Sequence, residues 1–175
     1  FVYTVYFELL IETMNGTSFV AKNAQSMKKI LQGELTQMQS AFDKNNTARR
    51  YMKAISGKTA ELLSLSCLEG VYFAGGDKKL QYSARKIGRA IGLAFQVRDD
   101  ILDVTADFDA LGKTPGKDVV AGKSTYPALL GLGKSHAILE ESLNKAEAIF
   151  KDLAEDQGFK QDNIMKIIER LRLHA

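Results

Sequence analysis

The sequence has few of the residues that break helices or cross-link a chain. Only two prolines occur in 175 residues, Pro115 and Pro127, and tryptophan is absent. Because proline is the residue most hostile to an α-helix, almost every segment of this chain is free to be helical. Cys67 is the single cysteine, which excludes an intrachain disulfide and a cysteine-built metal site. Such cysteine usage is typical of a reducing compartment, and we expect a cytoplasmic protein.

The sequence also lacks a strong charge of either sign. It has 24 Lys and Arg against 21 Asp and Glu, a net charge of +3. This balance does not provide the basic stripe typical of nucleic-acid binders, so we expect no nucleic-acid partner. Long hydrophobic runs are missing as well, because Glu8 and Glu12 interrupt the apolar start of the chain well before a membrane-spanning length. The sequence therefore predicts no transmembrane segment.

Apolar residues recur at helical spacing along most of the chain, and no alternating strand pattern persists. This periodicity predicts an all-α fold, an antiparallel helical bundle, with residues 1–175 in a single domain. The chain starts at Phe1 within such a pattern and not at a methionine, so we expect further N-terminal helices upstream. The helices are expected at 1–14, 18–42, 48–54, 57–74, 78–105, 125–133, 135–157 and 161–173. Glycines and lysines crowd residues 106–124, which predicts a loop.

The helix expected at 78–105 contains a cluster of acidic residues. Helical spacing places four polar side chains on one face: Gln96, Asp99, Asp100 and Asp103. Three apolar neighbours are expected to face the core: Ile91, Phe95 and Leu102. Carboxylates one turn apart repel by about 0.2–0.5 kcal/mol per pair, and a cation removes that repulsion. Oxygen ligands without histidine or thiolate suit Mg²⁺, although an acidic face in contact with water is the simpler alternative.

The loop that follows contains three lysines, Lys113, Lys117 and Lys123, each preceded by glycine. Glycine allows backbone amides to approach an anion closely, which indicates phosphate binding beside the aspartates. A nucleotide-binding P-loop is the competing interpretation. Five residues separate Gly116 from Gly122 where that motif needs four, and no strand precedes them. A solvated lysine loop is the remaining alternative.

Two glycine-containing motifs lie earlier in the chain. Gly57-Lys58-Thr59 begins the helix expected at 57–74, and the simplest role of Thr59 is to cap that helix, with Lys58 at its mouth. In the helix expected at 18–42, Gly33 interrupts a good helical pattern at a cost of about 1 kcal/mol. That cost suggests that another helix packs closely against Gly33.

Together these motifs resemble the trans-isoprenyl diphosphate synthases, the polyprenyl synthetase family. Phe95-Gln96-x-x-Asp99-Asp100-x-x-Asp103 is similar to the second aspartate-rich motif of that family. The Gly-Lys motifs within 111–129 follow at the family's spacing, the segment 57–60 precedes at the expected distance, and 32–34 is similar to its glutamine-rich helix. The residues of these motifs are most similar to those of bacterial medium- or long-chain enzymes, such as catalytic subunits of heptaprenyl diphosphate synthase. The family's first aspartate-rich motif is missing from these residues, so the resemblance implies a C-terminal portion.

The resemblance implies a fold of the isoprenoid synthase type and a Mg²⁺-dependent prenyltransferase. Such an enzyme ionises an allylic diphosphate, condenses it with isopentenyl diphosphate, and makes an all-trans polyprenyl diphosphate. The implied metal ligands are Asp99, Asp100 and Asp103. The implied diphosphate-binding residues are Lys58, Lys113 and Lys123. The implied catalytic residues are Lys58, Thr59, Gln96, Asp99 and Asp100, with oxygens of Thr59, Gln96 and the Lys58 carbonyl sheltering the allylic cation.

Two other functions remain to be weighed. A non-catalytic or regulatory subunit of a heteromeric synthase need not keep metal ligands, so the aspartates argue against it. A class I terpene cyclase also uses Mg²⁺ and a diphosphate, but its second metal motif is typically built on Asn, Ser and Glu, and that motif is not found.

A partner subunit is expected from the first two helices. Residues 1–14 are apolar around most of the helix, and the second helix adds a stripe of large apolar residues, Met27, Leu31, Leu35 and Met38. A helix that is apolar on two sides must bury both of them. In the resembled family the corresponding helices pack across a two-fold axis, which implies a homodimer or a heterodimer with a small unlike subunit.

Overall fold

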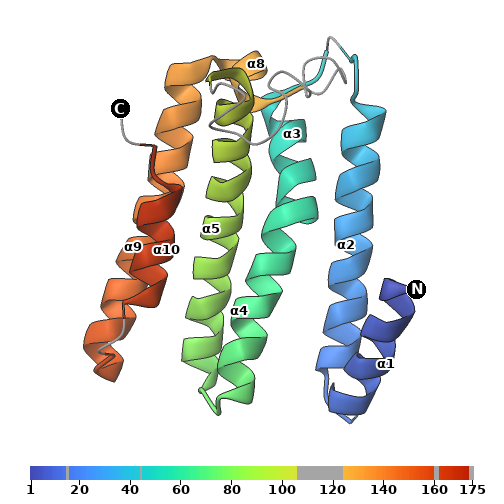
Figure 1. Ribbon diagram of the computed structural model, residues 1–175, viewed down its shortest axis with the longest axis vertical. Coiled ribbons are helices and arrows are strands. Elements are labelled where there is room, and N and C mark those ends of the chain that lie inside the picture. The colour runs from blue at the N-terminus through green and yellow to red at the C-terminus, as the bar shows by residue number, and fades with distance from the viewer. Residues whose placement is uncertain (15, 44, 106–123, 160–161, 174–175) are drawn as a thin grey trace.

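The computed structural model describes the chain except for residues 15, 44, 106–123, 160–161 and 174–175. All regular elements among the described residues are helical, which confirms the predicted all-α class, and Figure 1 shows them as coiled ribbons. The elements are α1 (Val2–Met14), α2 (Phe19–Gln39), α3 (Ala48–Ile55), the π-helical turn η1 (Ser56–Ala60), α4 (Glu61–Phe73), α5 (Lys78–Thr105), α8 (Tyr126–Leu130), α9 (Leu132–Gln157) and α10 (Asn163–Leu171). None of these helices is both long and apolar enough to cross a membrane.

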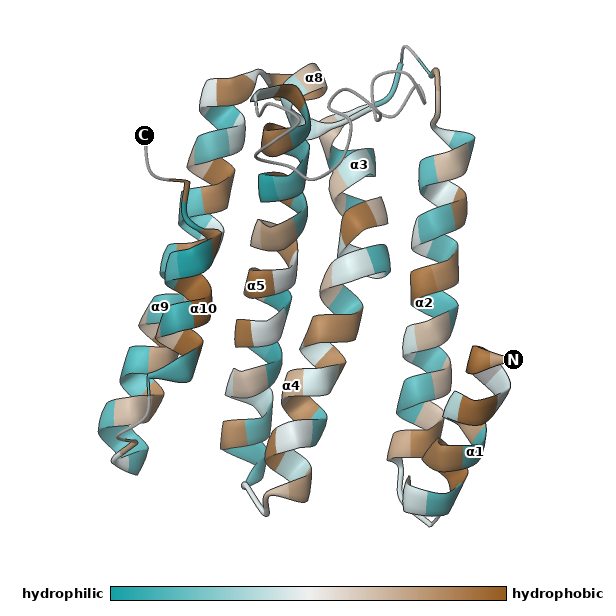
Figure 2. Cartoon of the chain, viewed as in Figure 1, coloured by the Kyte–Doolittle hydropathy of each residue, from teal (hydrophilic) through white to brown (hydrophobic). Residues whose placement is uncertain are grey.

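Consecutive long helices lie antiparallel and side by side, with α5 between α9 and α4, and with α2 beyond α3 and α4 (Figure 1). The hydrophobic core lies where these neighbouring helices pack together. Its buried members come mostly from α3, α5 and α9: Tyr51, Ile55, Ile87, Ile91, Ala94, Val97, Ile101, Leu139, Leu143 and Ala146. Each long helix carries both hydrophilic and hydrophobic residues (Figure 2), the pattern of a helix packed on one side and solvated on the other.

Glycines bring the helices of the central layer into backbone contact. A Cβ atom on Gly33 would lie 2.6 Å from the carbonyl oxygen of Ala54 and from the amide nitrogen of Lys58. This contact confirms that another helix packs closely against Gly33. On α5, a Cβ atom on Gly92 would lie 2.6 Å from the Cα of Ala60, and Gly88 lies directly against the carbonyl of Leu63. Any larger residue at these crossings would force the helices apart.

The main departure from the expected helices is at residues 55–60. We expected one helix to end near 54 and another to begin at 57, but α3 continues through η1 into α4. Thr59 therefore lies inside a π-helical turn, and its predicted capping role is wrong, since Ala60 precedes α4. A π turn holds an extra residue and redirects the side chains within it, which is why such turns often occur at functional sites.

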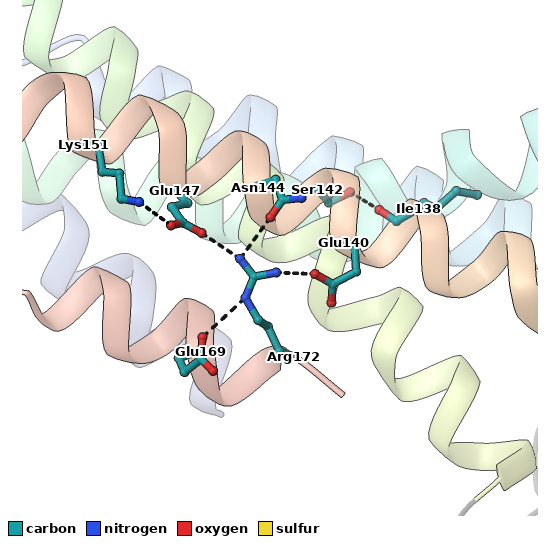
Figure 3. A network of polar contacts seen from close by, with 8 residues as sticks. All are labelled: Ile138, Glu140, Ser142, Asn144, Glu147, Lys151, Glu169 and Arg172. Atoms are coloured by element: carbon teal, nitrogen blue, oxygen red, sulfur yellow. Dashed lines mark hydrogen bonds and ion pairs between the residues drawn. The ribbon is translucent and has the colours of Figure 1, made fainter. Parts of the chain in front are cut away.

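The C-terminal helix is fastened to α9 by Arg172 (Figure 3). Its guanidinium donates to the carboxylates of Glu140 and Glu147, the latter at 2.7 Å, and to the amide oxygen of Asn144 at 3.0 Å. Glu169 lies 3.4 Å from the Nε atom. Because the Arg172 side chain is largely buried, this arrangement orients α10 more strongly than an exposed ion pair would.

The glycine crossings lead to a first prediction. We expect Gly88→Ala to destabilise the protein by about 1–3 kcal/mol, because the new methyl group meets the backbone of α4. Gly70→Ala is the matched control, since nothing lies within 4 Å of a Cβ atom there, and alanine should stabilise α4 by about 0.5–1 kcal/mol. Urea denaturation followed by circular dichroism measures both. Equal midpoints for the two variants would contradict close packing at Gly88.

Candidate active site

Three of the residues singled out in the sequence form one hydrogen-bonded chain. The Thr59 hydroxyl donates to the amide oxygen of Gln96 at 3.1 Å, and the Gln96 amide nitrogen donates to Oδ1 of Asp100 at 3.1 Å. Thr59 comes from η1, whereas Gln96 and Asp100 lie one turn apart on α5. The fold therefore brings together two motifs that lie 37 residues apart in the sequence.

The Asp100 carboxylate is completely buried, with 0% of the residue exposed. Its Oδ2 atom accepts a hydrogen bond of 2.6 Å from the Tyr51 hydroxyl and one of 3.1 Å from the backbone amide of Tyr126. Together with Gln96, these donors compensate the loss of water around the charge. Asp100 therefore links α3, α5 and the start of α8.

Tyr126 donates its backbone amide to Asp100, and its ring is buried. The ring packs edge-on against Tyr51 with the centroids 5.1 Å apart. Burial of the phenol, and secondarily the negative charge of Asp100, raise the pKa of Tyr126 to about 12. The hydroxyl thus stays protonated throughout the physiological pH range. The sequence analysis did not predict the contacts of Tyr51 and Tyr126 with Asp100. The one available indication was that a buried carboxylate needs hydrogen-bond donors nearby.

The three aspartates differ in accessibility. Asp100 and Asp103 are buried, whereas Asp99 is partly exposed. Among the described residues, no group of three or more His, Cys, Asp or Glu side chains is placed to hold a metal ion. The ligand set Asp99, Asp100 and Asp103 remains a prediction. Its all-oxygen donors fit Mg²⁺ chemically, and Asp99 is the most accessible of the three.

Phe95 corrects the expected orientation of α5. We expected it to face the core with Ile91 and Leu102, but it is 50% exposed, whereas Ile91 is buried and Leu102 is half-buried. Phe95 precedes Asp99 by one helical turn and therefore shares its side of the helix. The faces that α5 buries are those that contact α9 and α4. An exposed aromatic ring thus lies on the same side of α5 as the accessible aspartate.

Lys58 is held by α2. Its ammonium donates to the amide oxygen of Gln37 at 3.0 Å and forms an ion pair of 2.5 Å with Glu34. Its neighbour Thr59 reaches Gln96 on α5 instead, so two consecutive side chains of η1 contact the helices on either side. Lys113 and Lys123, the other expected diphosphate-binding residues, lie outside the described residues.

The Asp100 contacts lead to a second prediction. Tyr51→Phe keeps the buried ring but removes one donor from a buried carboxylate, so we expect a loss of about 1–3 kcal/mol in unfolding free energy. Tyr82→Phe is the control, because Tyr82 is exposed, and it should change stability by less than about 0.5 kcal/mol. Thermal and urea denaturation test both variants. Indistinguishable unfolding of Tyr51→Phe and wild type would show that this hydrogen bond contributes nothing.

Comparison with known proteins identifies the family. The sequence profile described as Polyprenyl synthetase matches residues 1–168, and the chain belongs to this family. This result confirms the resemblance read from the sequence motifs.

Individual relatives cover this chain to different extents. Octaprenyl diphosphate synthase of Haemophilus influenzae is 30% identical over 174 residues, which are 99% of this chain and 50% of that protein. Geranylgeranyl pyrophosphate synthase 3, chloroplastic, of Arabidopsis thaliana is 51% identical over 90 residues, 51% of this chain and 25% of the relative. The chain thus spans from a quarter to half the length of these relatives. The names of these two relatives refer to prenyl products of different chain lengths.

Solved structures share the fold. Geranylgeranyl pyrophosphate synthase from Lactobacillus brevis is similar with a TM-score of 0.79 and 27% identity, covering 97% of this chain and 62% of that one. Polyprenyl synthase from Caulobacter crescentus, in complex with calcium and isoprenyl diphosphate, has a TM-score of 0.80 and 26% identity, covering 94% and 60%. These similarities confirm the expected isoprenoid synthase type of helical bundle.

Proposed function

We propose that the protein containing this chain is a prenyl diphosphate synthase. It would condense isopentenyl diphosphate with an allylic diphosphate and release an all-trans polyprenyl diphosphate. The observation that carries the proposal is the hydrogen-bonded chain from Thr59 through Gln96 to Asp100, which joins the family's separated motifs at one place. The relative that covers nearly the whole chain, an octaprenyl diphosphate synthase, supports it.

The reaction makes one carbon–carbon bond. The allylic carbon–oxygen bond breaks, and the diphosphate leaves with the bonding electron pair. The double bond of isopentenyl diphosphate supplies the pair for the new bond. A proton then passes from the adjacent carbon to the released diphosphate, the strongest base that the reaction itself provides, and a double bond is restored.

The oxygens of Thr59 and Gln96 are suited to stabilising the allylic cation. Because the Gln96 amide nitrogen is fixed by Asp100, its carbonyl oxygen is directed toward Thr59. Dipoles that are already oriented need not reorganise when positive charge develops, and this preorganisation lowers the barrier. In this proposal Asp100 orients Gln96 as well as belonging to the acidic segment.

The proposal includes a metal ion and three lysines for the diphosphate. Asp99, Asp100 and Asp103 form the metal-binding segment, with Asp99 the most accessible. Bound Mg²⁺ would neutralise the negative charge that develops on the leaving diphosphate. The calcium in the similar Caulobacter crescentus structure supports a divalent cation in this fold. Lys58, Lys113 and Lys123 would add positive charge, and Lys58 would have to exchange its contact with Glu34 for the substrate.

A third prediction tests this function directly. In the full-length protein, Asp99→Ala should lower turnover by at least about 100-fold at saturating Mg²⁺ while the helix content stays unchanged, because charge stabilisation in the transition state is lost. Asp152→Ala, at an exposed position of α9, is the control and should retain activity. Incorporation of labelled isopentenyl diphosphate, with chromatography of the products, measures turnover and product length together.

The same assay separates the alternative functions. Near-wild-type turnover of Asp99→Ala would remove the metal role of this aspartate. No incorporation by the wild-type protein would indicate a non-catalytic subunit, and hydrocarbon products would indicate a cyclase.

We also propose that this protein works as a dimer. Three large apolar side chains on α2, those of Leu31, Leu35 and Met38, are more than half exposed, and their spacing of three and four residues places them on one helix face. Leu9 and Ile11 of α1 are exposed as well. A second subunit, identical or smaller and unlike, would bury these surfaces.

A fourth prediction concerns this interface. Replacing Leu31 and Leu35 together by Glu should convert the full-length protein from dimer to monomer, because buried unpaired carboxylates are strongly unfavourable. Ala137→Glu, an exposed position on α9, is the control and should leave assembly unchanged. Sedimentation equilibrium at micromolar concentration distinguishes the species. A monomeric wild-type protein, with or without substrate, would refute the dimer.

A further inference from the structure

A cleft of about 820 Å³ lies between α2, the α3–η1 segment and α5. Five basic side chains line it, from three helices: Lys29, Arg49, Arg50, Lys53 and Arg89. Glu61 is the single acidic residue among its described lining residues. The cleft is therefore strongly cationic, although the whole chain carries a net charge of only +3.

This cleft is separate from the proposed active site. None of the described residues of that site, from Lys58 and Thr59 to the aspartates of α5, is among those lining it. Gly33 and Gly57 line it instead, and their backbones are in contact where α2 crosses η1. Lys29 and Glu34 are about 140° apart around α2 at the helical angle per residue. The cleft and the Lys58–Glu34 pair thus lie on different sides of that crossing.

The described acidic residues around the cleft pair with only two of its five basic side chains. Glu61 pairs with Lys29 at 2.7 Å, and Arg50 pairs with Asp43 at 2.9 Å. Burial tends to raise the pKa of Glu61, but hydrogen bonds from Lys29 and Ser26 and the charges of Lys29 and Arg85 outweigh it, so its pKa is lowered and the carboxylate stays ionised.

The other three cations are not paired by the described residues. Arg49, Lys53 and Arg89 have no ion pair with any residue that the structure describes. Arg49 and Arg89 come from different helices, so positive charge reaches the cleft from two walls.

The first turn of α3 makes this arrangement more unusual. Thr47 caps the helix by accepting a hydrogen bond from the Arg50 amide, so Arg49 and Arg50 both lie in its first turn. Cations there oppose the helix dipole and cost about 0.3–1 kcal/mol each. Asp43 already offsets the placement of Arg50, whereas Arg49 has no ion pair with a described residue, and an anion bound in the cleft would offset its unfavourable placement.

We propose that this cleft binds a diphosphate group, either the free anion or one carried by an organic molecule. Its volume lies within the usual range of small-molecule sites. Arginines on two walls match a diphosphate, because each guanidinium can donate two parallel hydrogen bonds to phosphoryl oxygens. This site is additional to the diphosphate site of the proposed prenyl transfer.

The fifth prediction is a titration of the full-length protein with inorganic diphosphate in EDTA, measured by calorimetry. Removing divalent metal suppresses metal-dependent binding at the proposed active site and leaves the cleft. The test variant combines Arg49→Gln with Arg89→Gln, and the control combines Lys145→Gln with Arg170→Gln, which removes two exposed cations on α9 and α10. We expect the test variant to weaken binding by about tenfold or more and the control to change it by less than about twofold.

Titrations with other ligands test whether the cleft binds the free anion or an organic diphosphate. Isopentenyl and geranyl diphosphates should bind as tightly as the inorganic ion or more tightly, and lose that affinity in the same variant. Absence of saturable diphosphate binding below about 1 mM would overturn the proposal, as would equal affinities of the two variants. Binding of anionic lipid vesicles in place of diphosphate would overturn it as well. Prenyl transfer assayed with Mg²⁺ tests the proposed function separately, because the cleft variant leaves its residues intact.

Discussion

The buried carboxylate of Asp100 is the constraint on which the central part of this structure depends. A carboxylate removed from water is strongly unfavourable unless donors replace the lost solvent. Here the donors are the Tyr51 hydroxyl, the Tyr126 backbone amide and the Gln96 side chain. They come from α3, the start of α8 and α5 itself. Moving α3 or the start of α8 would remove a donor from this buried charge, so the requirement to satisfy one carboxylate favours one arrangement of these three elements.

Close approach of backbones is the second constraint, and it makes the first one possible. Gly92 allows α5 to lie against Ala60, and Gly33 allows α2 to lie against η1. With α5 this near, Thr59 reaches Gln96; with α2 this near, Lys58 reaches Glu34. Both contacts start from the π turn, whose consecutive residues Lys58 and Thr59 contact different helices. The glycines and the π turn thus act together to form the polar network around Asp100.

Local patterns in the sequence were sufficient to predict most helices, since few prolines interrupt a strong helical periodicity. They were also sufficient to predict close packing at Gly33, because a glycine within a good helix needs a reason. The continuity of α3 through η1 was not predictable, since a π turn depends on what packs against it. Phe95 was misplaced for a related reason: periodicity defines a helix face, but only the neighbouring helices determine which face is buried. The roles of Tyr51 and Tyr126 depend on contacts distant in sequence, which no local pattern encodes.

The near-neutral net charge conceals a separation of charge across the α2–η1 crossing. On one side, Lys58 is neutralised by Glu34, and its neighbour Thr59 is linked through Gln96 to the carboxylate of Asp100. On the other side, Arg49, Lys53 and Arg89 supply positive charge that no described acidic residue balances. The composition of the whole chain averages these two regions. It argues against an extended basic surface, but it does not reveal a local basic cleft. The backbones of Gly33 and Gly57 are in contact where the two sides meet, so an anion in the cleft would alter the electrostatic potential at Lys58 most at low ionic strength, where screening is weak.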